Sequence, residues 1–229
     1  MIRIFFEEYK MSPTHEQVFA GQAVYTKRNL AFYDFFILGI SSNIIWNCPS
    51  VRIRAHYDNH ITSNHLDVGV GTGYFLDHCR FPTSSPRIGL MDLNQNALDY
   101  ASGRIARYKP ETYHRNVLEV ISINSGKFDS VAMNLILHCI PGSIASKAVA
   151  FDHVKELLNP EAVIFGSTLL YDGVSSNWFA KRMMNIYNRK GIFSNRQDDL
   201  EGLTYELKQR FSDVVVETQG SVALFSARN

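Results

Sequence analysis

The residues best suited to chemistry form one glycine-rich run: Leu66-Asp67-Val68-Gly69-Val70-Gly71-Thr72-Gly73. Glycine lets a backbone turn tightly and approach a ligand that a Cβ would block. Asp67 comes just before the glycines, so a carboxylate is expected beside the same ligand. An acid in that place repels a pyrophosphate and suits an ammonium group. The run therefore predicts a binding site for a cationic ligand.

A second acid, Asp92, ends the next apolar segment. In sheets of parallel strands, an acid at this point binds ribose hydroxyls, since a carboxylate accepts two hydrogen bonds well. A dinucleotide site needs the spacing G-x-G-x-x-G, but here Gly73 comes one residue early and Tyr74 takes the expected place. The ligand should carry a ribose and an ammonium group but no phosphate, as S-adenosylmethionine does.

The elements that must position these residues alternate between strand and helix. We expect strands over 65–70, 87–92, 112–117, 128–135, 162–170, 213–218 and 221–227. We expect helices over 25–46, 49–59, 74–79, 94–108, 143–158, 178–188 and 197–210. This alternation predicts an α/β fold with a Rossmann-like, doubly wound, seven-stranded and mostly parallel sheet. Only about two residues separate the last two strands, which predicts a C-terminal antiparallel hairpin.

Composition limits the remaining possibilities. The chain has 229 residues, 45% of them hydrophobic, and a net charge of +1. We expect one domain over 63–229, preceded by a helical cover or lid over 1–62. The balanced charge disfavours a nucleic-acid partner, and the apolar stretch 30–46 is too polar to span a membrane. The three scattered cysteines lack zinc spacing, so we expect reduced thiols in a cytoplasmic protein without a metal, which is compatible with a homodimer.

Taken together, these segments resemble the class I S-adenosylmethionine-dependent methyltransferases. Residues 66–73 resemble their first motif, 88–94 the second, 128–135 the fourth, and 157–162 the turn before the fifth strand. The resemblance covers about 63–229. Further upstream, Tyr33, Asp34, Gly39 and Trp46 are similar to the N-terminal helix of ubiquinone and menaquinone C-methyltransferases, although Asn47 stands where those often have arginine.

The resemblance implies roles for individual residues. The amino-acid part of S-adenosylmethionine would contact Asp67, Gly69, Gly71 and Gly73, with Tyr25 closing over its carboxylate. The ribose and adenine would contact Asp92 and Leu93, and the adenine would be bordered by Asn116 and Val117. Asn134 would place a backbone carbonyl near the sulfonium.

Catalytic candidates follow from the reaction itself. A methyl group on a sulfonium is already activated, so the protein must align a nucleophile and exclude water. His138, after the fourth strand, could be a base, a hydrogen-bond donor to the substrate or a packed loop residue. Tyr33 and Tyr171 could line the substrate pocket. Arg189 and Lys190 could attract an anionic substrate or be solvated charges at the C-terminus of a helix.

Three functional hypotheses remain at this point. The leading one is a methyltransferase of secondary metabolism that acts on a small aromatic or apolar molecule by in-line displacement. The second is a methyltransferase-like protein that keeps the cofactor but acts as a pericyclase, a cyclase or a regulatory partner. The third is an NAD-dependent oxidoreductase, against which Tyr74, Asp67 and the terminal hairpin argue. The mass of the product separates the first two hypotheses.

Overall fold

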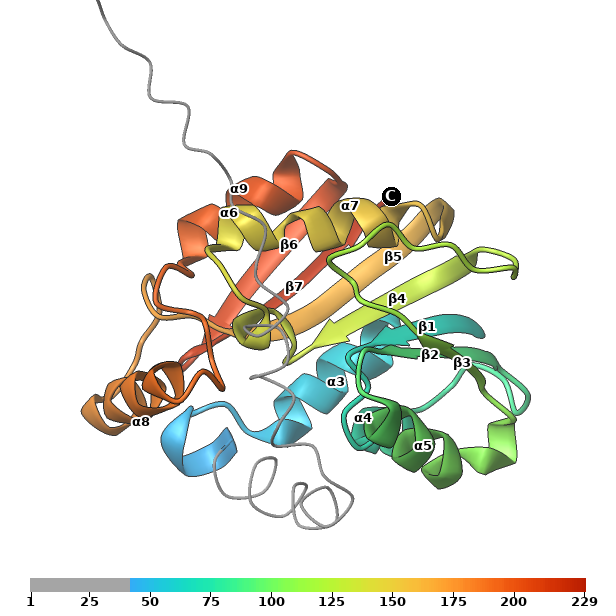
Figure 1. Ribbon diagram of the computed structural model, residues 1–229, viewed down its shortest axis with the longest axis horizontal. Helices are drawn as coiled ribbons and strands as arrows, with labels where there is room; N and C mark the ends of the chain where they lie inside the picture. Colours follow the sequence, from blue (N-terminus) through green and yellow to red (C-terminus); the bar gives the residue numbers. More distant parts are fainter. Residues whose placement is uncertain (1–41) are drawn as a thin grey trace, which may run out of the picture.

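The computed structural model of the chain describes residues 42–229. At its centre is a seven-stranded sheet in the order β3-β2-β1-β4-β5-β7-β6 (Figure 1). The strands are β1 (Asn64–Val68), β2 (Arg87–Asp92), β3 (Glu111–His114), β4 (Phe128–Asn134), β5 (Leu158–Leu169), β6 (Ser212–Gln219) and β7 (Val222–Arg228). The strands from β3 to β5 pair in parallel, and β7 runs antiparallel to both of its neighbours. This confirms the predicted fold class and the terminal hairpin.

Helices cover both faces of the sheet, as Figure 1 shows. One layer holds α3 (Ser50–His60), α4 (Tyr74–His78) and α5 (Gln95–Arg104). The other holds α6 (Ile144–Lys147), α7 (Val149–Lys155) and α9 (Leu200–Lys208). The helix α8 (Trp178–Arg189) lies at the side of the molecule toward which the β4 arrow points. Two short 3-10 helices, η2 (Ala106–Tyr108) and η3 (Leu137–Cys139), and a π-helical turn over 42–45 are also present.

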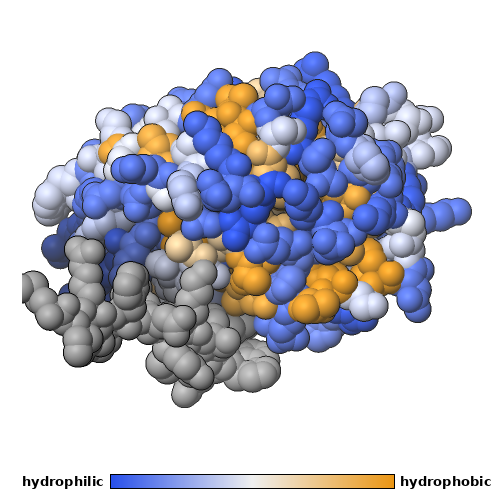
Figure 2. Space-filling model, turned by 90° about the horizontal axis from the view of Figure 1, so that it is seen from above, coloured by the Kyte–Doolittle hydropathy of each residue, from blue (hydrophilic) through white to orange (hydrophobic). Residues whose placement is uncertain are grey.

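Burial explains why the central strands are so apolar. Every residue of β4 except Asp129 is buried, because helices pack on both sides of a parallel sheet. By contrast, β6 forms the edge of the sheet and has no buried residue. On the face seen in Figure 2, hydrophilic atoms predominate and apolar ones gather in separate patches. No helix within residues 42–229 is long and apolar enough to cross a membrane.

Several predicted boundaries were wrong. The third strand ends at His114, so Asn116 and Val117 lie in the turn that follows it. The fifth strand begins at Leu158 instead of 162, because a left-handed residue, Glu161 (φ +62°), lets the chain bulge and still pair with β4. The helix predicted over 143–158 is divided into α6 and α7. The helix predicted from 197 starts at Leu200, because the Asp199 carboxylate caps the amide of Gly202.

The predicted cover over 1–62 lies mostly outside the described residues, and Tyr25 and Tyr33 lie there too. Within its described part, α3 packs against β5 and β7, with Pro49 as its N-cap. The boundary at residue 62, the cytoplasmic location and the homodimer stay predictions.

Candidate active site

The glycine-rich turn leaves β1 at Val68 and leads into α4. Gly69, Gly71 and Gly73 all have positive φ angles of +75°, +51° and +70°. A Cβ on Gly69 would lie 2.5 Å from Cδ1 of Ile136, and one on Gly73 would lie 3.1 Å from the Cβ of Ala101. Gly73 therefore serves the packing of the turn on α5, whereas a Cβ on Gly71 would meet only open space. Glycine is required at position 71 because the backbone there is left-handed.

Two pockets flank this turn at the carboxyl ends of the parallel strands. The first pocket, about 110 Å³, lies between the turn, the end of β2 and the loop 135–141. It is lined by six predicted residues: Gly69, Gly71, Asp92, Leu93, Asn116 and Val117. The second pocket, about 50 Å³, is lined by five: Asp67, Gly69, Gly71, Gly73 and Asn134. Since both pockets share Gly69, Gly71 and Leu135, the structure brings these predicted residues together around one turn.

In the first pocket, Asp92 is a half-buried carboxylate at the end of β2. Its Oδ1 accepts a hydrogen bond from the backbone amide of Asn94 at 2.8 Å. Burial raises the pKa of Asp92 to about 6, although the backbone amides of Asn94, Gly71 and Val70 act in the opposite direction. Asp92 is thus an acceptor that additional hydroxyl donors would stabilise.

In the second pocket, an acid and an unpaired amide lie on the same wall. Asp67 is 6% exposed, and its Oδ2 accepts a hydrogen bond from the hydroxyl of Tyr57 at 2.5 Å. The Oδ1 of Asn134 accepts from the Oγ of Ser167 at 2.9 Å. Its Nδ2 is buried and has no hydrogen-bond partner in the structure. This pocket therefore combines a carboxylate that can accept hydrogen bonds from a cation with a lining asparagine whose buried Nδ2 has no partner among residues 42–229.

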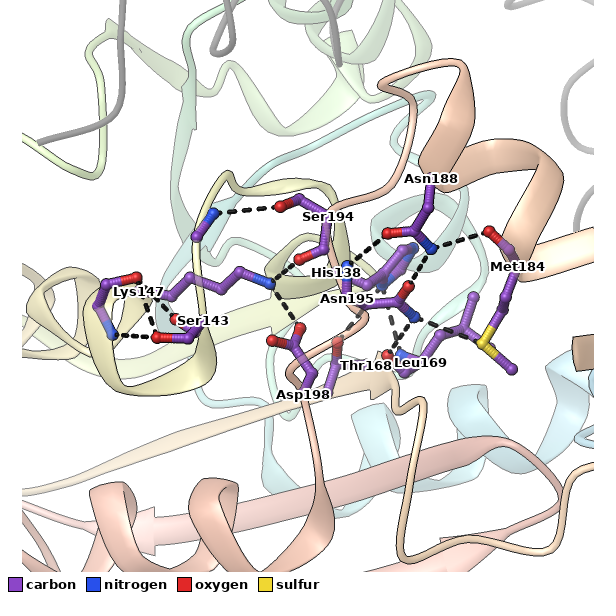
Figure 3. Close-up of polar contacts among 12 residues, drawn as sticks. His138, Ser143, Lys147, Thr168, Leu169, Met184, Asn188, Ser194, Asn195 and Asp198 are labelled. Carbon is purple, nitrogen blue, oxygen red and sulfur yellow. Dashed lines mark hydrogen bonds and ion pairs between the residues drawn. The ribbon is translucent and has the colours of Figure 1, made fainter. Parts of the chain in front are cut away.

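His138 lies beyond β4 in η3 and is buried beside Thr168 and Leu169 (Figure 3). It does not itself line the first pocket, whereas its neighbour Cys139 does. Its Nδ1 accepts a long hydrogen bond from the amide of Leu169 at 3.4 Å and lies 3.4 Å from the Oγ1 of Thr168. Burial, with a smaller effect from the charge of Lys147, lowers the pKa of His138 to about 3. The ring is therefore neutral at pH 7. Because an amide can only donate, the contact with Leu169 favours the tautomer that carries its proton on Nε2.

A buried ion pair holds the segment 194–198 beside His138. The Nζ of Lys147 reaches from α6 to the Oδ2 of Asp198 at 2.5 Å and to the carbonyl of Ser194 at 2.6 Å (Figure 3). The amide of Ser194 donates to the carbonyl of His138 at 2.8 Å. The Nδ2 of Asn195 donates to the carbonyl of Leu169 at 3.0 Å. These contacts hold residues 194–198 against α6, η3 and the end of β5.

The remaining predicted substrate residues lie apart from the two pockets. The hydroxyl of Tyr171 donates to Asn185 at 3.1 Å, so it is already satisfied. Arg189 and Lys190 are exposed at the end of α8, where Arg189 lines an open hollow together with Arg196 and Phe193. Within residues 42–229, no group of three metal-ligating side chains could hold a metal ion. The absence of a metal from the whole protein stays a prediction.

Sequence reasoning missed the residues that support Asp67. His65 precedes Asp67 by two positions in β1, so both side chains point to the same face, and this was a usable signal. Tyr57 gave no such signal, because its contact with Asp67 arises only when α3 folds onto the sheet. The sequence likewise gave no signal for the contact between Lys147 and Asp198, which lie 51 positions apart.

Comparisons with known proteins agree with this arrangement. The family described as "Methyltransferase domain" matches residues 66–164. Demethylluteothin O-methyltransferase of Streptomyces thioluteus is 38% identical over 212 residues, which cover 93% of this chain and 92% of the relative. Physcion biosynthesis cluster O-methyltransferase of Aspergillus chevalieri is 36% identical over 220 residues, or 95% of this chain and 97% of the relative.

Solved structures share the fold at low sequence identity. The chain matches the complex of DhpI with S-adenosylhomocysteine at a TM-score of 0.68 and 13% identity, covering 94% of this chain and 98% of that one. The fold and the pockets define a Rossmann-like enzyme domain, and the relatives specify which kind. The chain belongs to the S-adenosylmethionine-dependent methyltransferases. The oxidoreductase hypothesis is thereby set aside.

Proposed function

We propose that this enzyme transfers the methyl group of S-adenosylmethionine to an acidic hydroxyl, phenolic or enolic, of an aromatic secondary metabolite. Two relatives that match this chain over nearly its full length are named O-methyltransferases, one for demethylluteothin and one in the physcion biosynthesis cluster. The observation that carries the acidity of the acceptor is the hydrogen bond from the Leu169 amide to the Nδ1 of His138.

The two pockets fit the proposed cofactor. In the first, Asp92 would accept the ribose hydroxyls, while Leu93, Asn116 and Val117 border the adenine. In the second, Asp67 would accept the ammonium group and the unpaired Nδ2 of Asn134 would donate to the carboxylate. When bound, S-adenosylmethionine supplies an activated methyl group on its sulfonium. Tyr25 and Tyr33 remain predicted contributors from outside the described residues.

The chemistry on the acceptor side follows from His138. With its proton on Nε2 and its Nδ1 facing Leu169, the neutral ring is a hydrogen-bond donor rather than a base. We therefore propose that the Nε2–H of His138 donates a hydrogen bond to a carbonyl oxygen of the substrate. A hydroxyl conjugated with such a carbonyl is acidic, so it reaches its nucleophilic ionised form without help from a base. The protein then has to align that oxygen with the methyl group and exclude water.

The proposal is tested by mass spectrometry with S-adenosylmethionine that carries a deuterated methyl group. The acceptors are matched pairs of aromatic hydroxyl compounds with and without a carbonyl group beside the hydroxyl. We expect the purified enzyme to add one deuterated methyl group to oxygen in the carbonyl-bearing member of each pair. Methylation of nitrogen or carbon only would contradict the proposal. A product isomerised without gain of mass would instead support the pericyclase alternative.

Two variants separate a donor from a base at His138. His138→Gln keeps an N–H donor near Nε2, whereas His138→Leu has none. We expect His138→Gln to retain most of kcat/KM and His138→Leu to lose roughly 10-fold or more, the range expected for one lost hydrogen bond. Thr168→Val, which removes only the hydroxyl beside Nδ1, is the matched control. Equal losses in both His138 variants would contradict the donor role.

A further inference from the structure

We propose that Tyr57 and His65 are positioning residues for the cofactor. They form a buried hydrogen-bond relay, from β4 through β1 to α3, that orients the Asp67 carboxylate toward the ammonium group of the cofactor. This inference rests on the proposed function, which places that ammonium group in the second pocket. It adds two residues to the binding site that do not themselves line the pocket.

The relay consists of four side chains, three of them fully buried. The hydroxyl of Tyr57 lies 2.5 Å from the Oδ2 of Asp67 and 2.9 Å from the Nε2 of His65. The Nδ1 of His65 lies 2.8 Å from the Oγ of Ser130 in β4. That Oγ also accepts a hydrogen bond from the amide of Thr62 at 3.0 Å. Tyr57, His65 and Ser130 are each 0% exposed.

Only one arrangement of protons satisfies all of these contacts. A carboxylate cannot donate, so the Tyr57 hydroxyl donates to Asp67 and accepts from the Nε2–H of His65. The unprotonated Nδ1 of His65 then accepts from the Ser130 hydroxyl. Burial lowers the pKa of His65, which keeps the ring neutral as this tautomer requires. Every donor in the relay therefore points toward Asp67, and aligned hydrogen bonds of this kind strengthen one another.

Packing leaves the relay little freedom to rearrange. The Tyr57 ring stacks on Phe75 at a centroid distance of 5.8 Å and meets Phe165 edge-on at 5.1 Å. The His65 ring stacks on Phe165 at 5.8 Å. Because both rings are fixed, the Oδ2 of Asp67 is held on the side of α3. The carboxylate is therefore held in one orientation. Asp67 lines the second pocket.

The charge around Asp67 suggests why the relay is needed. No lysine or arginine of the described residues pairs with Asp67, and its closest basic group is the neutral His65 at 4.0 Å. A carboxylate that is 6% exposed and has no cationic partner within residues 42–229 is costly to bury. The relay offsets part of this cost with neutral donors. The ammonium group of a ligand would supply the missing positive charge.

The inference is tested by calorimetry with two ligands. S-adenosylhomocysteine carries the amino-acid part, whereas 5′-methylthioadenosine keeps the adenosine and thioether but lacks it. We expect Tyr57→Phe to weaken binding of S-adenosylhomocysteine roughly 10-fold, as expected for a lost hydrogen bond to a charged group. Binding of 5′-methylthioadenosine should not change. The matched control is Tyr113→Phe, which removes another hydroxyl bound to a carboxylate, that of Glu111, away from both pockets.

A second pair of variants keeps the test decisive if Tyr57→Phe does not fold. His65→Gln retains an N–H donor for Tyr57 and should bind S-adenosylhomocysteine better than His65→Leu. An equal loss for both ligands, or no loss for S-adenosylhomocysteine, would overturn the relay while wild-type binding still supports the proposed function. If the wild type binds neither ligand, the proposed function fails and the relay fails with it.

Discussion

At the residue scale, the site depends on two acids in different environments. The carboxylate of Asp67 receives a side-chain hydrogen bond from Tyr57. The carboxylate of Asp92 accepts a hydrogen bond from a backbone amide, that of Asn94, and burial raises its pKa to about 6. The proposed ligand groups differ accordingly, with a cation expected at Asp67 and neutral hydroxyl donors at Asp92.

The raised pKa of Asp92 leads to a prediction about stability. The usual pKa is 3.8, so the folded state holds this proton more tightly than the unfolded state, and stability is lost as the pH rises from about 3.8 to about 6. Asp92→Asn should therefore increase the free energy of unfolding at pH 7 by roughly 1–2 kcal/mol. Below about pH 4 the gain should vanish, because the wild-type carboxyl is then protonated in both states. Urea unfolding at the two pH values measures this.

The same substitution should weaken the binding of S-adenosylhomocysteine, because an amide accepts ribose hydroxyls less well than a carboxylate. Asp99→Asn is the control, since this exposed carboxylate accepts a hydrogen bond from Gln95 in its own helix at 2.8 Å and lines neither pocket. An equal gain in stability at both pH values would show that burial of the Asp92 charge is not the cause.

The sequence indicated some of these residues and concealed others. The sequence predicted that Asp67, Asp92 and the glycines lie together, because the turn is local and is identified by residue spacing. The side-chain role of Asn134 was not found, since its unpaired Nδ2 is evident only when Ser167 occupies the Oδ1. The role of His138 stayed open for the same reason, because its tautomer depends on Leu169, 31 positions away.

At the element scale, the ion pair of Lys147 and Asp198 joins α6 to the segment before α9. Both side chains are 0% exposed, and burial lowers the pKa of Lys147 while raising that of Asp198 to about 6. At 2.5 Å each group stabilises the charge of the other. The pair therefore holds elements together only while both partners are present.

This coupling predicts a non-additive pair of substitutions. Lys147→Met should lower the free energy of unfolding by roughly 3–5 kcal/mol, because it leaves the Asp198 carboxylate buried and unpaired. The double variant Lys147→Met/Asp198→Leu should recover most of that loss, since no buried charge then remains. Chemical denaturation of the wild type, both single variants and the double variant measures the coupling. Additive losses would contradict it.

The element boundaries show where sequence patterns were insufficient. Pro160 and Glu161 looked like a turn before the fifth strand, but a bulge at Glu161 keeps this segment in the sheet. Such a bulge depends on pairing with β4, which no local pattern encodes. The alternation of strands and helices was easier to predict, because apolar runs in a parallel sheet are buried on both faces.

At the scale of the whole molecule, the strand order places the site. The strand β1 lies between β2 and β4, so the chain crosses to opposite sides of β1 and leaves a crevice at its carboxyl end. The glycine turn, Asp92 and Asn134 all lie at the ends of these three strands. One topological feature thus positions residues that are far apart in the sequence.

We propose that S-adenosylmethionine lies across the two pockets around this turn. A crystal structure with bound S-adenosylhomocysteine tests it most directly. We predict the ribose hydroxyls at Asp92, the ammonium group at Asp67 and the carboxylate at the Nδ2 of Asn134. A ligand bound elsewhere, or with its amino-acid part directed away from Asp67, would contradict the account.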